Sequence, residues 1–511
     1  MCKPSDDFEG PRNVVIAGAG PAGLLLTALL MQRNSELSTP LYRVTLVDNR
    51  RNFGLVSLEE LTKSYRSWML GLAGHGCKAL QTCEGLYQEY CKEVGIELRS
   101  LSLHLGAKEI KPTISPEDLV DNENFIVDRN FIVAAIARFV EEKYHDNDMC
   151  TTLYDHKLLY VDYEKRRVLV RNEKDDQEFY MPYDLLVGCD GVRSVVREAL
   201  VKRHSTFEMD VGDIFQTFKA VHVERPPSVD LASLHLLPAV FPEMTGIALP
   251  ETGNKLNIGI GVARHLFDQL PAELKSDDPK VVAEYARQNF KAFELVDYDD
   301  FGEQWANQRW NRTGQVHCNF YHSSEISVAI MGDAAHATSP SIGMGMNTAL
   351  RDAQVFYQLL QEHKDNLTEV LPEFSNKRVK EGNSLTDLAM HLYCMDTRQQ
   401  LFETIHMIVR GALHKMLPSL ILDHPQNMIG RVKFQLSDVY NRAKVVGVLD
   451  KHRRINAETR QAYFEKTNGM TSPETQAMTK GGWMSSKTLL SGAVVVAGVA
   501  VGYFQWMAHC M

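Results

Sequence analysis

The sequence NVVIAGAGPAGLLLTALLM, residues 13–31, decides the fold class. Its first part, 13–17, is mostly apolar and β-branched, which is typical of a buried strand. Gly18, Gly20 and Gly23 follow at the spacing of a tight strand-to-helix turn, and the apolar run 24–31 is typical of a helix. Gly18 permits the turn, Gly20 lets the backbone approach a pyrophosphate, and Gly23 allows the helix to pack closely on the strand. The stretch therefore predicts a dinucleotide-binding strand–turn–helix unit.

A second apolar run, 43–47, ends in Asp48. An acid at this distance from the glycine turn hydrogen-bonds an adenosine ribose hydroxyl in dinucleotide-binding proteins. The glycines and Asp48 do not separate NAD from FAD, so later segments must decide between these two dinucleotides. A glycine turn without any ligand is the alternative, and the presence of Asp48 argues against it.

Two later segments carry the decisive pattern. A strand-like run at 183–187 leads into Gly-Cys-Asp-Gly at 188–191, and another at 326–331 leads into Gly332 and Asp333. A loop rich in glycine follows, with Pro340, Gly343, Gly345, Met346 and Asn347. Together with the glycine turn, these segments resemble the single-component flavoprotein monooxygenases in order and spacing.

The resemblance implies FAD as the cofactor. Asp333 would then bind the ribityl chain, and the loop from Pro340 would run beside the isoalloxazine ring, where a helix beginning near Asn347 stabilises the reduced, anionic flavin. Arg129 matches the family arginine that contacts flavin; an arginine at a solvated helix start is the alternative. The predicted cofactor-binding residues are Gly18, Gly20, Gly23, Asp48, Arg129, Asp333, Pro340, Gly343, Gly345, Met346 and Asn347.

Within this family the chain is most similar to the kynurenine 3-monooxygenases, over residues 14–419. The similarity extends beyond the flavin motifs to segments between them. Its landmarks are Arg66-Ser67, Leu70, Gly76, Ala79-Leu80, Gly188 to Gly191, Gly332 to Ala337, Gly345-Met346-Asn347, Leu413-His414 and Pro418-Ser419.

The positions that hold the kynurenine carboxylate in those enzymes differ here. Leu101 stands where the resemblance places an arginine, and Arg99 lies two positions earlier, which shifts its reach along a strand by roughly 6 to 7 Å. Leu392 stands at the position of a pocket asparagine, although the adjacent Tyr393 is retained. These four residues are the predicted substrate pocket. Because a buried carboxylate without a cation is costly, the apolar replacements favour a substrate with less charge than kynurenine.

Only one dinucleotide fingerprint is present, because the glycines at 259–261 sit in an alternating strand pattern. NADPH or NADH must therefore bind transiently. The resemblance implies that it reduces FAD, that O2 adds to the reduced flavin as a hydroperoxide, and that one oxygen atom passes to an aromatic substrate. No side chain is predicted to be catalytic, and His336 is interpreted as a support of the Asp333 loop. The protein positions the substrate and excludes water.

The predicted fold is α/β, with an FAD-binding Rossmann-type domain interleaved with an antiparallel-sheet substrate domain. Alternating runs such as 217–223 and 256–262 indicate the strands of that sheet. The predicted boundaries are 1–205 for the FAD-binding domain with part of the substrate domain inserted near 85–125, 206–325 mainly for the substrate sheet, 326–365 for the continued FAD-binding domain, 366–470 for a helical cap and 471–487 for a linker.

The run 488–508 is apolar and uncharged, and at about 1.5 Å per residue it is long enough to cross a hydrocarbon core of about 30 Å. It predicts a transmembrane helix that anchors the chain in lipid by its tail. Lys480 and Lys487 precede it, so the positive-inside bias places the catalytic domain in the cytosol. The resemblance implies the mitochondrial outer membrane rather than the endoplasmic reticulum; a buried core helix is the alternative.

Composition excludes other classes. Across 511 residues, 65 Asp and Glu outnumber 55 Lys and Arg, so we expect no nucleic-acid partner. The nine cysteines are scattered, and the cluster at 317–322 has no fourth ligand nearby, so neither a disulfide framework nor a metal site is predicted. The polar segment 1–11 lacks the apolar core of a secretion signal.

Two other functions stay open. One is the same flavin chemistry on a more apolar secondary metabolite or lipid, by hydroxylation or epoxidation, which Leu101 and Leu392 favour. The other is a tail-anchored, flavin-containing binding protein without activity. The residues Gly343, Gly345 and Asn347 argue against the second, because the resemblance places them beside the reactive ring.

Overall fold

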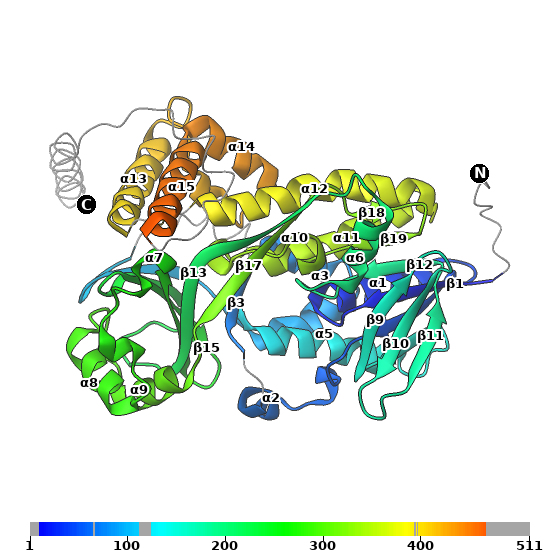
Figure 1. Cartoon of the computed structure of the whole chain (residues 1–511), viewed down its shortest axis with the longest axis horizontal. Helices are drawn as coiled ribbons and strands as arrows, with labels where there is room; N and C mark the ends of the chain where they lie inside the picture. The colour runs from blue at the N-terminus through cyan, green and yellow to red at the C-terminus, as the bar shows by residue number, and fades with distance from the viewer. Residues whose placement is uncertain (1–9, 65–66, 112–123, 393–394, 396, 467–511) are drawn as a thin grey trace. The chain divides into compact units, whose positions relative to one another are not determined.

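The computed structural model describes residues 10–64, 67–111, 124–392, 395 and 397–466 (Figure 1). The chain forms two compact units. The first comprises Met1–Tyr393 and Met428–Asn441, and the second comprises Cys394–Asn427 and Arg442–Met511. All the residues that the sequence predicts at the cofactor site belong to the first unit.

A six-stranded sheet forms the centre of the first unit. Its strand order is β18-β19-β12-β1-β2-β8, and every pair is parallel except β18 with β19. The parallel strands are buried on both faces, which explains their continuous apolar sequences. The strands are β1 (Arg12–Ala17), β2 (Tyr42–Val47), β8 (Cys150–Leu153), β12 (Leu185–Gly188), β18 (His322–Ser323) and β19 (Val328–Ile330).

Helices pack against this sheet and against one another. The first helix, α1, contacts β2, α5 and α11, and its apolar sequence is buried from Ala22 to Met31. Helix α6 contacts the neighbouring strands β12 and β19 of the same sheet. The helices of this layer are α1 (Pro21–Glu36), α2 (Leu58–Ser64), α3 (Gly74–Gln81), α5 (Arg129–Tyr144), α6 (Val195–Arg203), α10 (Asp333–His336), α11 (Gly345–Glu362) and α12 (Leu367–His391).

Two small antiparallel sheets accompany the central one. One has the order β11-β10-β9, and the other has the order β3-β7-β4. Their strands are β9 (His156–Asp162), β10 (Arg167–Asn172), β11 (Glu178–Pro182), β3 (Met69–Leu72), β4 (Gly95–Glu97) and β7 (Phe125–Asp128).

A seven-stranded sheet forms the substrate part of the first unit. Its order is β17-β13-β16-β15-β14-β5-β6, and all pairs are antiparallel except β14 with β5. The strands are β5 (Ser100–Leu105), β6 (Lys108–Ile110), β13 (Met209–Glu224), β14 (Ser233–Phe241), β15 (Met244–Glu251), β16 (Lys255–Ala263) and β17 (Asn311–Cys318), and the helices beside them are α7 (Arg264–Phe267), α8 (Pro279–Asn289) and α9 (Tyr298–Asn307).

The two faces of this sheet pack against different partners. On the outer face, α8 and α9 cover a core that contains Val221, Ile258 and Trp305 (Figure 1). On the inner face, Ile247 and Leu249 join a smaller apolar cluster with Met69, Ile126, Leu98 and Leu234. Met69 and Ile126 come from β3 and β7, so the inner face lies against the three-stranded sheet. The predicted strands at 217–223 and 256–262 are confirmed as parts of β13 and β16.

The second unit is helical. It contains α13 (Thr397–Met416), α15 (Val448–Lys466) and the end of α14 (Leu436–Val446). Glu403 of α13 forms ion pairs with Lys451 and with the histidines His406 and His452, both at 3.7 Å. The predicted helical character of the C-terminal region is confirmed over these described helices.

The membrane part of the fold prediction is wrong. No helix among the residues described here has the length and the apolar composition needed to span a bilayer. The long helix α12, for example, carries charged residues along its sequence LTEVLPEFSNKRVKEGNSLTDLAMH. The segment 488–508 lies outside the described residues, so the structure contains nothing that supports a tail anchor, a lipid contact or the localisation derived from them.

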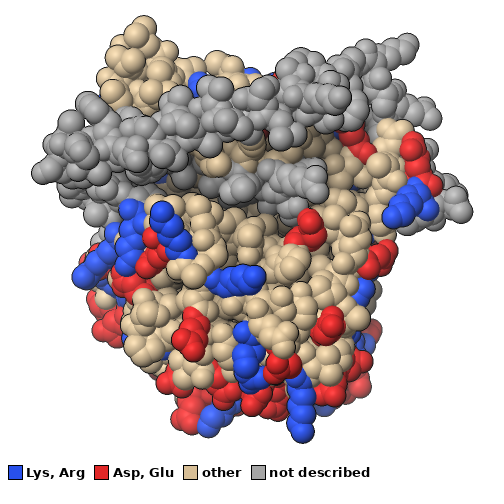
Figure 2. All heavy atoms as spheres, turned by 90° about the vertical axis from the view of Figure 1, so that its left-hand side faces the viewer, with Lys and Arg blue, Asp and Glu red and all other residues tan. Residues whose placement is uncertain are grey.

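Charges of both signs are mixed on the surface shown in Figure 2. There, the Lys and Arg side chains of the described residues are interspersed with Asp and Glu. This mixture is the arrangement expected from a net charge of −10 without clustering of either sign.

Candidate functional site

The glycine turn after β1 is formed by close backbone packing. Gly18 has φ +101°, and a Cβ built on it would lie 2.3 Å from the carbonyl oxygen of Cys189. A Cβ on Gly23 would lie 2.0 Å from the Gly18 carbonyl oxygen. A Cβ on Gly20, in contrast, would meet nothing within 4 Å. The open space in front of Gly20 is where the sequence predicts the pyrophosphate.

The helix N-termini at the predicted cofactor site have no side-chain caps. The N-cap of α1 is Gly20 and that of α11 is Met344, and neither accepts a backbone N–H through its side chain. Elsewhere, Asp128, Ser194 and Asn366 cap α5, α6 and α12 with side-chain oxygens. The first N–H groups of α1 and α11 therefore remain available to an anionic ligand, and the helix dipoles favour one.

Asp48 lies at the carboxyl end of β2, beside the glycine turn. Its Oδ2 accepts the N–H of Ala19 at 2.6 Å, and its Oδ1 accepts the Arg50 backbone N–H at 2.8 Å. The Arg50 guanidinium also donates to both carboxylate oxygens at 3.0 Å. A ribose hydroxyl at Asp48 would replace one of these guanidinium contacts.

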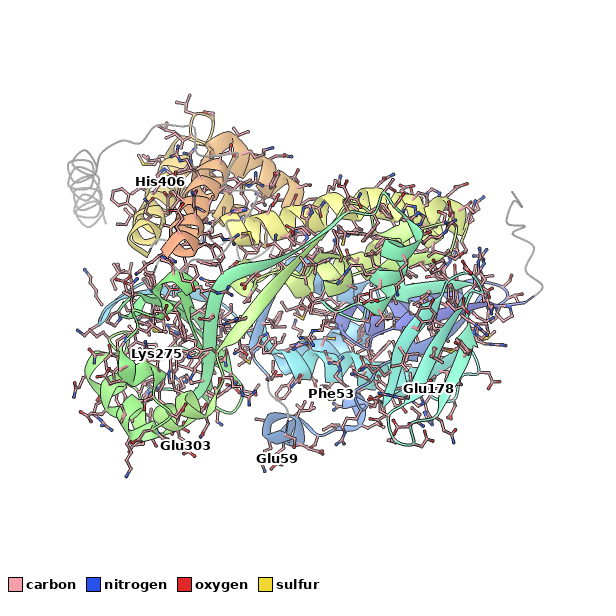
Figure 3. All side chains as sticks on the ribbon, viewed as in Figure 1. Phe53, Glu59, Glu178, Lys275, Glu303 and His406 are labelled. Carbon is pink, nitrogen blue, oxygen red and sulfur yellow. The ribbon has the colours of Figure 1, made fainter. Side chains whose placement is uncertain are left out.

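A small cavity, with room for about one water molecule, adjoins Asp48. Phe53, labelled in Figure 3, lies on its wall, and the Arg50 guanidinium lies 5.6 Å from the centre of the Phe53 ring. Apart from Asp48, Arg50 and Arg51, the residues of the wall are apolar or aromatic. The lining residues are Ala19, Asp48, Arg50, Arg51, Phe53, Val133, Ala137 and Tyr154.

Arg129 stands at the start of α5, between the adenosine end and the predicted ribityl site. Its guanidinium lies 4.6 Å from the centre of the Trp68 ring. Burial and the nearby charge of Arg50 lower the pKa of Arg129, while the charges of Asp333 and Asp128 oppose that effect. Arg129 is thus close enough to Arg50 and Asp333 to interact with both, which places it inside the site rather than in open solvent.

The predicted flavin loop begins at Gly332, which has φ +57°. Asp333 is exposed and is the first residue of α10. Pro340 is also exposed and opens a short 3₁₀ helix, Pro340–Ile342, which ends at Gly343 with φ +65°. Gly345 and the half-buried Met346 begin α11. The order of these elements agrees with a loop that follows the cofactor.

Asn347 holds this loop against β3. It is fully buried, its amide donates to the carbonyl oxygens of Gly71 at 2.9 Å and Gly343 at 3.0 Å, and its Oδ1 accepts the N–H of Ala73 at 2.8 Å. A Cβ on Gly76 would lie 2.4 Å from this Oδ1. The structure therefore shows a positioning contact for Asn347, with its amide already bonded to backbone.

A buried charged network lies behind the loop, and the sequence did not indicate it. Asp352 of α11 contacts His336 at 2.6 Å and Arg378 at 2.6 Å and accepts the N–H of Gly332 at 2.9 Å. Burial by itself would raise the pKa of Asp352, but the charges of His336 and Arg378 lower it to about 2. His336 thus supports the Asp333 loop, as its interpretation from sequence proposed. No motif spacing reveals Asp352, because its partners come from two other segments, at Gly332 to His336 and at Arg378.

The predicted substrate residues occupy different environments. The Arg99 side chain is 73 % exposed and pairs with Glu97 at 3.0 Å. Leu101 lies beside Leu234 in the β5–β14 ladder, and Leu392 is 3 % exposed at the end of α12. Tyr393 lies outside the described residues.

The site fits FAD. An open pyrophosphate position, a helix N-terminus without a side-chain cap, a carboxylate beside the glycine turn and a glycine-rich loop occur together in the first unit. The first two features match the phosphates of the dinucleotide, the carboxylate matches the ribose, and the loop matches the flavin.

Comparison with known proteins gives the same result. A family described as an FAD binding domain matches residues 150–387. The chain is 26% identical to kynurenine 3-monooxygenase of Anopheles gambiae, over 75% of this chain and 74% of that protein. It is 24% identical to violacein synthase of Chromobacterium violaceum, over 85% of this chain and 96% of that protein. The crystal structure of a mutant of 2-methyl-3-hydroxypyridine-5-carboxylic acid oxygenase matches 85% of this chain and 98% of its own, with a TM-score of 0.59 and 16% identity, and shows a common fold.

The chain is an FAD-dependent monooxygenase similar to the kynurenine 3-monooxygenases. The predicted FAD cofactor and the predicted α/β fold of the FAD-binding part are confirmed. The roles of the individual predicted residues, and the predicted domain boundaries, stay predictions.

Proposed function

We propose that this monooxygenase uses NADPH or NADH and O2 to hydroxylate an aromatic substrate that carries less charge than kynurenine. The observation that carries the proposal is the placement of Arg99. Its guanidinium faces solvent and is bonded to Glu97, which supports the inference that it does not replace the arginine that the resemblance places at Leu101. A substrate carboxylate beside the half-buried Leu101 would lie on an apolar surface without a cation, which is unfavourable.

The inner face of the seven-stranded sheet supports an apolar substrate. Leu234 and Ile247 contribute to the apolar cluster on that face, and Leu101 lies beside Leu234. Such a surface binds an aromatic ring through the hydrophobic effect and excludes water from the reaction. The sheet would therefore position the substrate and exclude water, and it would supply no reacting group.

FAD, when bound, supplies the redox chemistry, and the chain's own residues hold it in place. The N-terminus of α1 would bind the pyrophosphate, Asp48 would bind the ribose, Asp333 would bind the ribityl chain, and Arg129 would contact the flavin. Asn347 fixes the loop beside the ring through its contacts with Gly71 and Gly343. The N–H groups at the start of α11 favour negative charge on the ring.

Kynurenine itself is the second candidate substrate. The similarity to kynurenine 3-monooxygenase of Anopheles gambiae, over three quarters of both proteins, favours it. A cation for its carboxylate would then have to come from a residue other than Arg99 in the described position.

The test compares two substrates that differ by the carboxylate alone. Purified, FAD-loaded protein is mixed with NADPH or NADH, and oxidation of the nicotinamide is followed with L-kynurenine, with kynuramine, which lacks the carboxylate, and with a panel of neutral aromatics. Mass spectrometry detects the added oxygen atom. We expect kcat/KM for kynuramine or a neutral aromatic to exceed that for L-kynurenine, and the variant Arg99→Ala to leave KM unchanged.

Two results would contradict the proposal. A higher kcat/KM for L-kynurenine, together with a raised KM in Arg99→Ala, would show that a carboxylate pocket exists and that Arg99 reaches it. Oxidation of NADPH without transfer of oxygen to any aromatic compound would leave the chain without the proposed substrate class.

A further inference from the structure

Two buried histidines face each other on the outer side of the seven-stranded sheet. His104 lies on β5 and His235 on β14, and they are 5 % and 0 % exposed. The Nε2 of His104 lies 3.0 Å from the Nδ1 of His235. Phe293 packs edge-on against both rings, at 5.5 Å and 6.4 Å between ring centres. Neither histidine belongs to the cofactor site.

The hydrogen bonds of the pair cannot all be satisfied by two neutral rings. The Nδ1 of His104 lies 3.0 Å from the carbonyl oxygen of Ala292, and the Nε2 of His235 lies 3.0 Å from that of Asp230. A carbonyl only accepts, so each outer nitrogen must carry the N–H. A neutral imidazole has one N–H, and the two inner nitrogens are then both lone pairs, 3.0 Å apart.

Every other placement of the protons on two neutral rings leaves a different nitrogen with an unfavourable contact. If an inner nitrogen carries the proton, the outer nitrogen of the same ring turns a lone pair toward a carbonyl oxygen. The arrangement therefore requires a positive species between the inner nitrogens, either an additional proton or a metal ion.

A carboxylate completes the cluster. Glu109 of β6 stands directly opposite His104 in the antiparallel β5–β6 pair. One ligand atom from each of His104, His235 and Glu109 lies within 4.8 Å of the others. Glu109 is on the exposed edge of the sheet, where Lys111 lies 3.6 Å from its carboxylate. A negative charge next to two imidazole lone pairs is the donor set that binds zinc.

We propose that His104 Nε2, His235 Nδ1 and the Glu109 carboxylate form a binding site for a divalent transition-metal ion of the zinc type. With zinc–nitrogen bonds of about 2.0 to 2.1 Å, two nitrogens 3.0 Å apart subtend an angle of about 95° at the metal, which adjacent ligands of one ion adopt. The outer N–H groups bonded to Ala292 and Asp230 are the carbonyl contacts that orient metal-binding histidines. A water molecule would complete the four ligands that zinc prefers.

The site would join three strands at the end of the sheet. It connects β6 to β5 and β14, and β5 carries Leu101 on its opposite face. A metal there stabilises the edge of the sheet that bears the predicted substrate residue. Its role is structural, because the outer face is separated from the cofactor site by the sheet itself.

The experiment uses the full-length, FAD-loaded protein. Bound metal is removed with a chelator, Zn²⁺ is added, and zinc is counted by mass spectrometry after desalting, with the melting temperature recorded in parallel. We expect one zinc per chain and a rise in melting temperature. Glu109→Gln removes a ligand at an exposed position and should weaken zinc binding at least about tenfold while leaving the melting temperature of the metal-free protein unchanged.

His363→Gln is the matched control. His363 forms the other cluster of this kind among the described residues, with Glu362 and Glu373, and that cluster is at the surface. We expect this variant to retain the single zinc. Equal zinc affinity in wild type and Glu109→Gln, or loss of the zinc in His363→Gln, would overturn the proposal. The protein could also retain no zinc and show three N–H signals from the two rings in imidazole nitrogen NMR. A proton would then occupy the histidine pair, and this result would also overturn the proposal.

Discussion

At the scale of single residues, Gly18 and Gly20 occupy the same motif but tolerate a methyl group very differently. Gly20 has ordinary extended dihedral angles and open space before it, whereas Gly18 has φ +101° and lies against the Cys189 carbonyl. We expect Gly20→Ala to change the stability of the apoprotein by about 1 kcal/mol or less. The same methyl group fills the pyrophosphate position, so FAD affinity should fall about tenfold or more, or about 1.4 kcal/mol. Urea unfolding and flavin fluorescence titration measure the two effects.

Gly18→Ala is the matched comparison. Its methyl group would overlap a backbone oxygen at 2.3 Å and force a positive φ on alanine, so we expect the apoprotein itself to lose about 2 kcal/mol or more. If both variants lost stability equally and bound FAD equally, the assignment of the space before Gly20 to the pyrophosphate would be wrong.

Asp352 provides a second prediction at this scale. Asp352→Asn removes the negative charge between His336 and Arg378 and leaves the Arg378 guanidinium buried and uncompensated. We expect the free energy of unfolding to fall by about 3 to 5 kcal/mol at neutral pH and FAD affinity to weaken, because the Asp333 loop loses its support. Urea unfolding and FAD titration test this.

The pH dependence of the Asp352 contribution follows from its pKa. Because the folded-state pKa of about 2 lies below the unfolded value of about 3.9, the stabilisation is complete above the unfolded value and is lost as the pH falls toward 2. Glu362→Gln, on the exposed end of the same helix, should change stability by about 0.5 kcal/mol or less. A loss of that small size in Asp352→Asn would contradict the buried network.

Residue-level prediction from sequence succeeds where one segment contains all of the information. The tight turn predicted at Gly18 is one case, and the structure gives this glycine φ +101°. Asp352 could not be found in this way, because it sits on an ordinary amphipathic helix and its partners are remote in sequence.

At the scale of elements, the outer face of β13 contains an unusual buried cation. Lys219 is 4 % exposed, donates to the carbonyl oxygen of Trp305 at 2.6 Å, and lies 5.1 Å from the ring centres of Trp305 and Trp310. Burial lowers the pKa of Lys219 to about 8. No acidic side chain of the described residues forms an ion pair with it.

This strand therefore has a pH-dependent stability with a defined sign. Between about pH 8 and the unfolded lysine value of about 10.4, the unfolded chain binds the proton more tightly, so stability should rise with pH, by up to about 3 kcal/mol from this group. Lys219→Met should lack this rise. Urea unfolding of both proteins from about pH 7.5 to about pH 10 gives the comparison, and parallel pH profiles would contradict the lowered pKa.

Prediction of the elements from sequence was correct for individual strands but gave no information about which strands pair. Alternation identified parts of β13 and β16, and a buried apolar run identified β1. The parallel pairing of β14 with β5 joins segments separated by well over one hundred residues. Periodicity describes the faces of a strand and contains no information about its neighbour.

At the scale of the whole molecule, the cofactor site is contained in one of the two compact units. We expect calorimetry to show two unfolding transitions, of which FAD raises only the one belonging to the first unit. At a free FAD concentration of about one hundred times Kd, that transition should gain about 2.7 kcal/mol. Gly20→Ala should reduce this gain without moving the second transition. A single transition that shifts as a whole would mean that the two units unfold together.

The largest error from sequence was also at this scale. The apolar run 488–508 met the length criterion for a membrane span, but the described helices contain no such element. Length and hydropathy describe a segment by itself and contain no information about what surrounds the folded chain.

The open N-terminus of α1 also has a practical consequence at the bench. The N–H groups that we propose for the FAD pyrophosphate are equally suited to phosphate, sulfate or citrate from a buffer, because such groups recognise charge and oxygen rather than a nucleotide. Protein purified in such salts should lose flavin more readily than protein kept in chloride. The choice of buffer anion therefore decides how much of the preparation is holoenzyme.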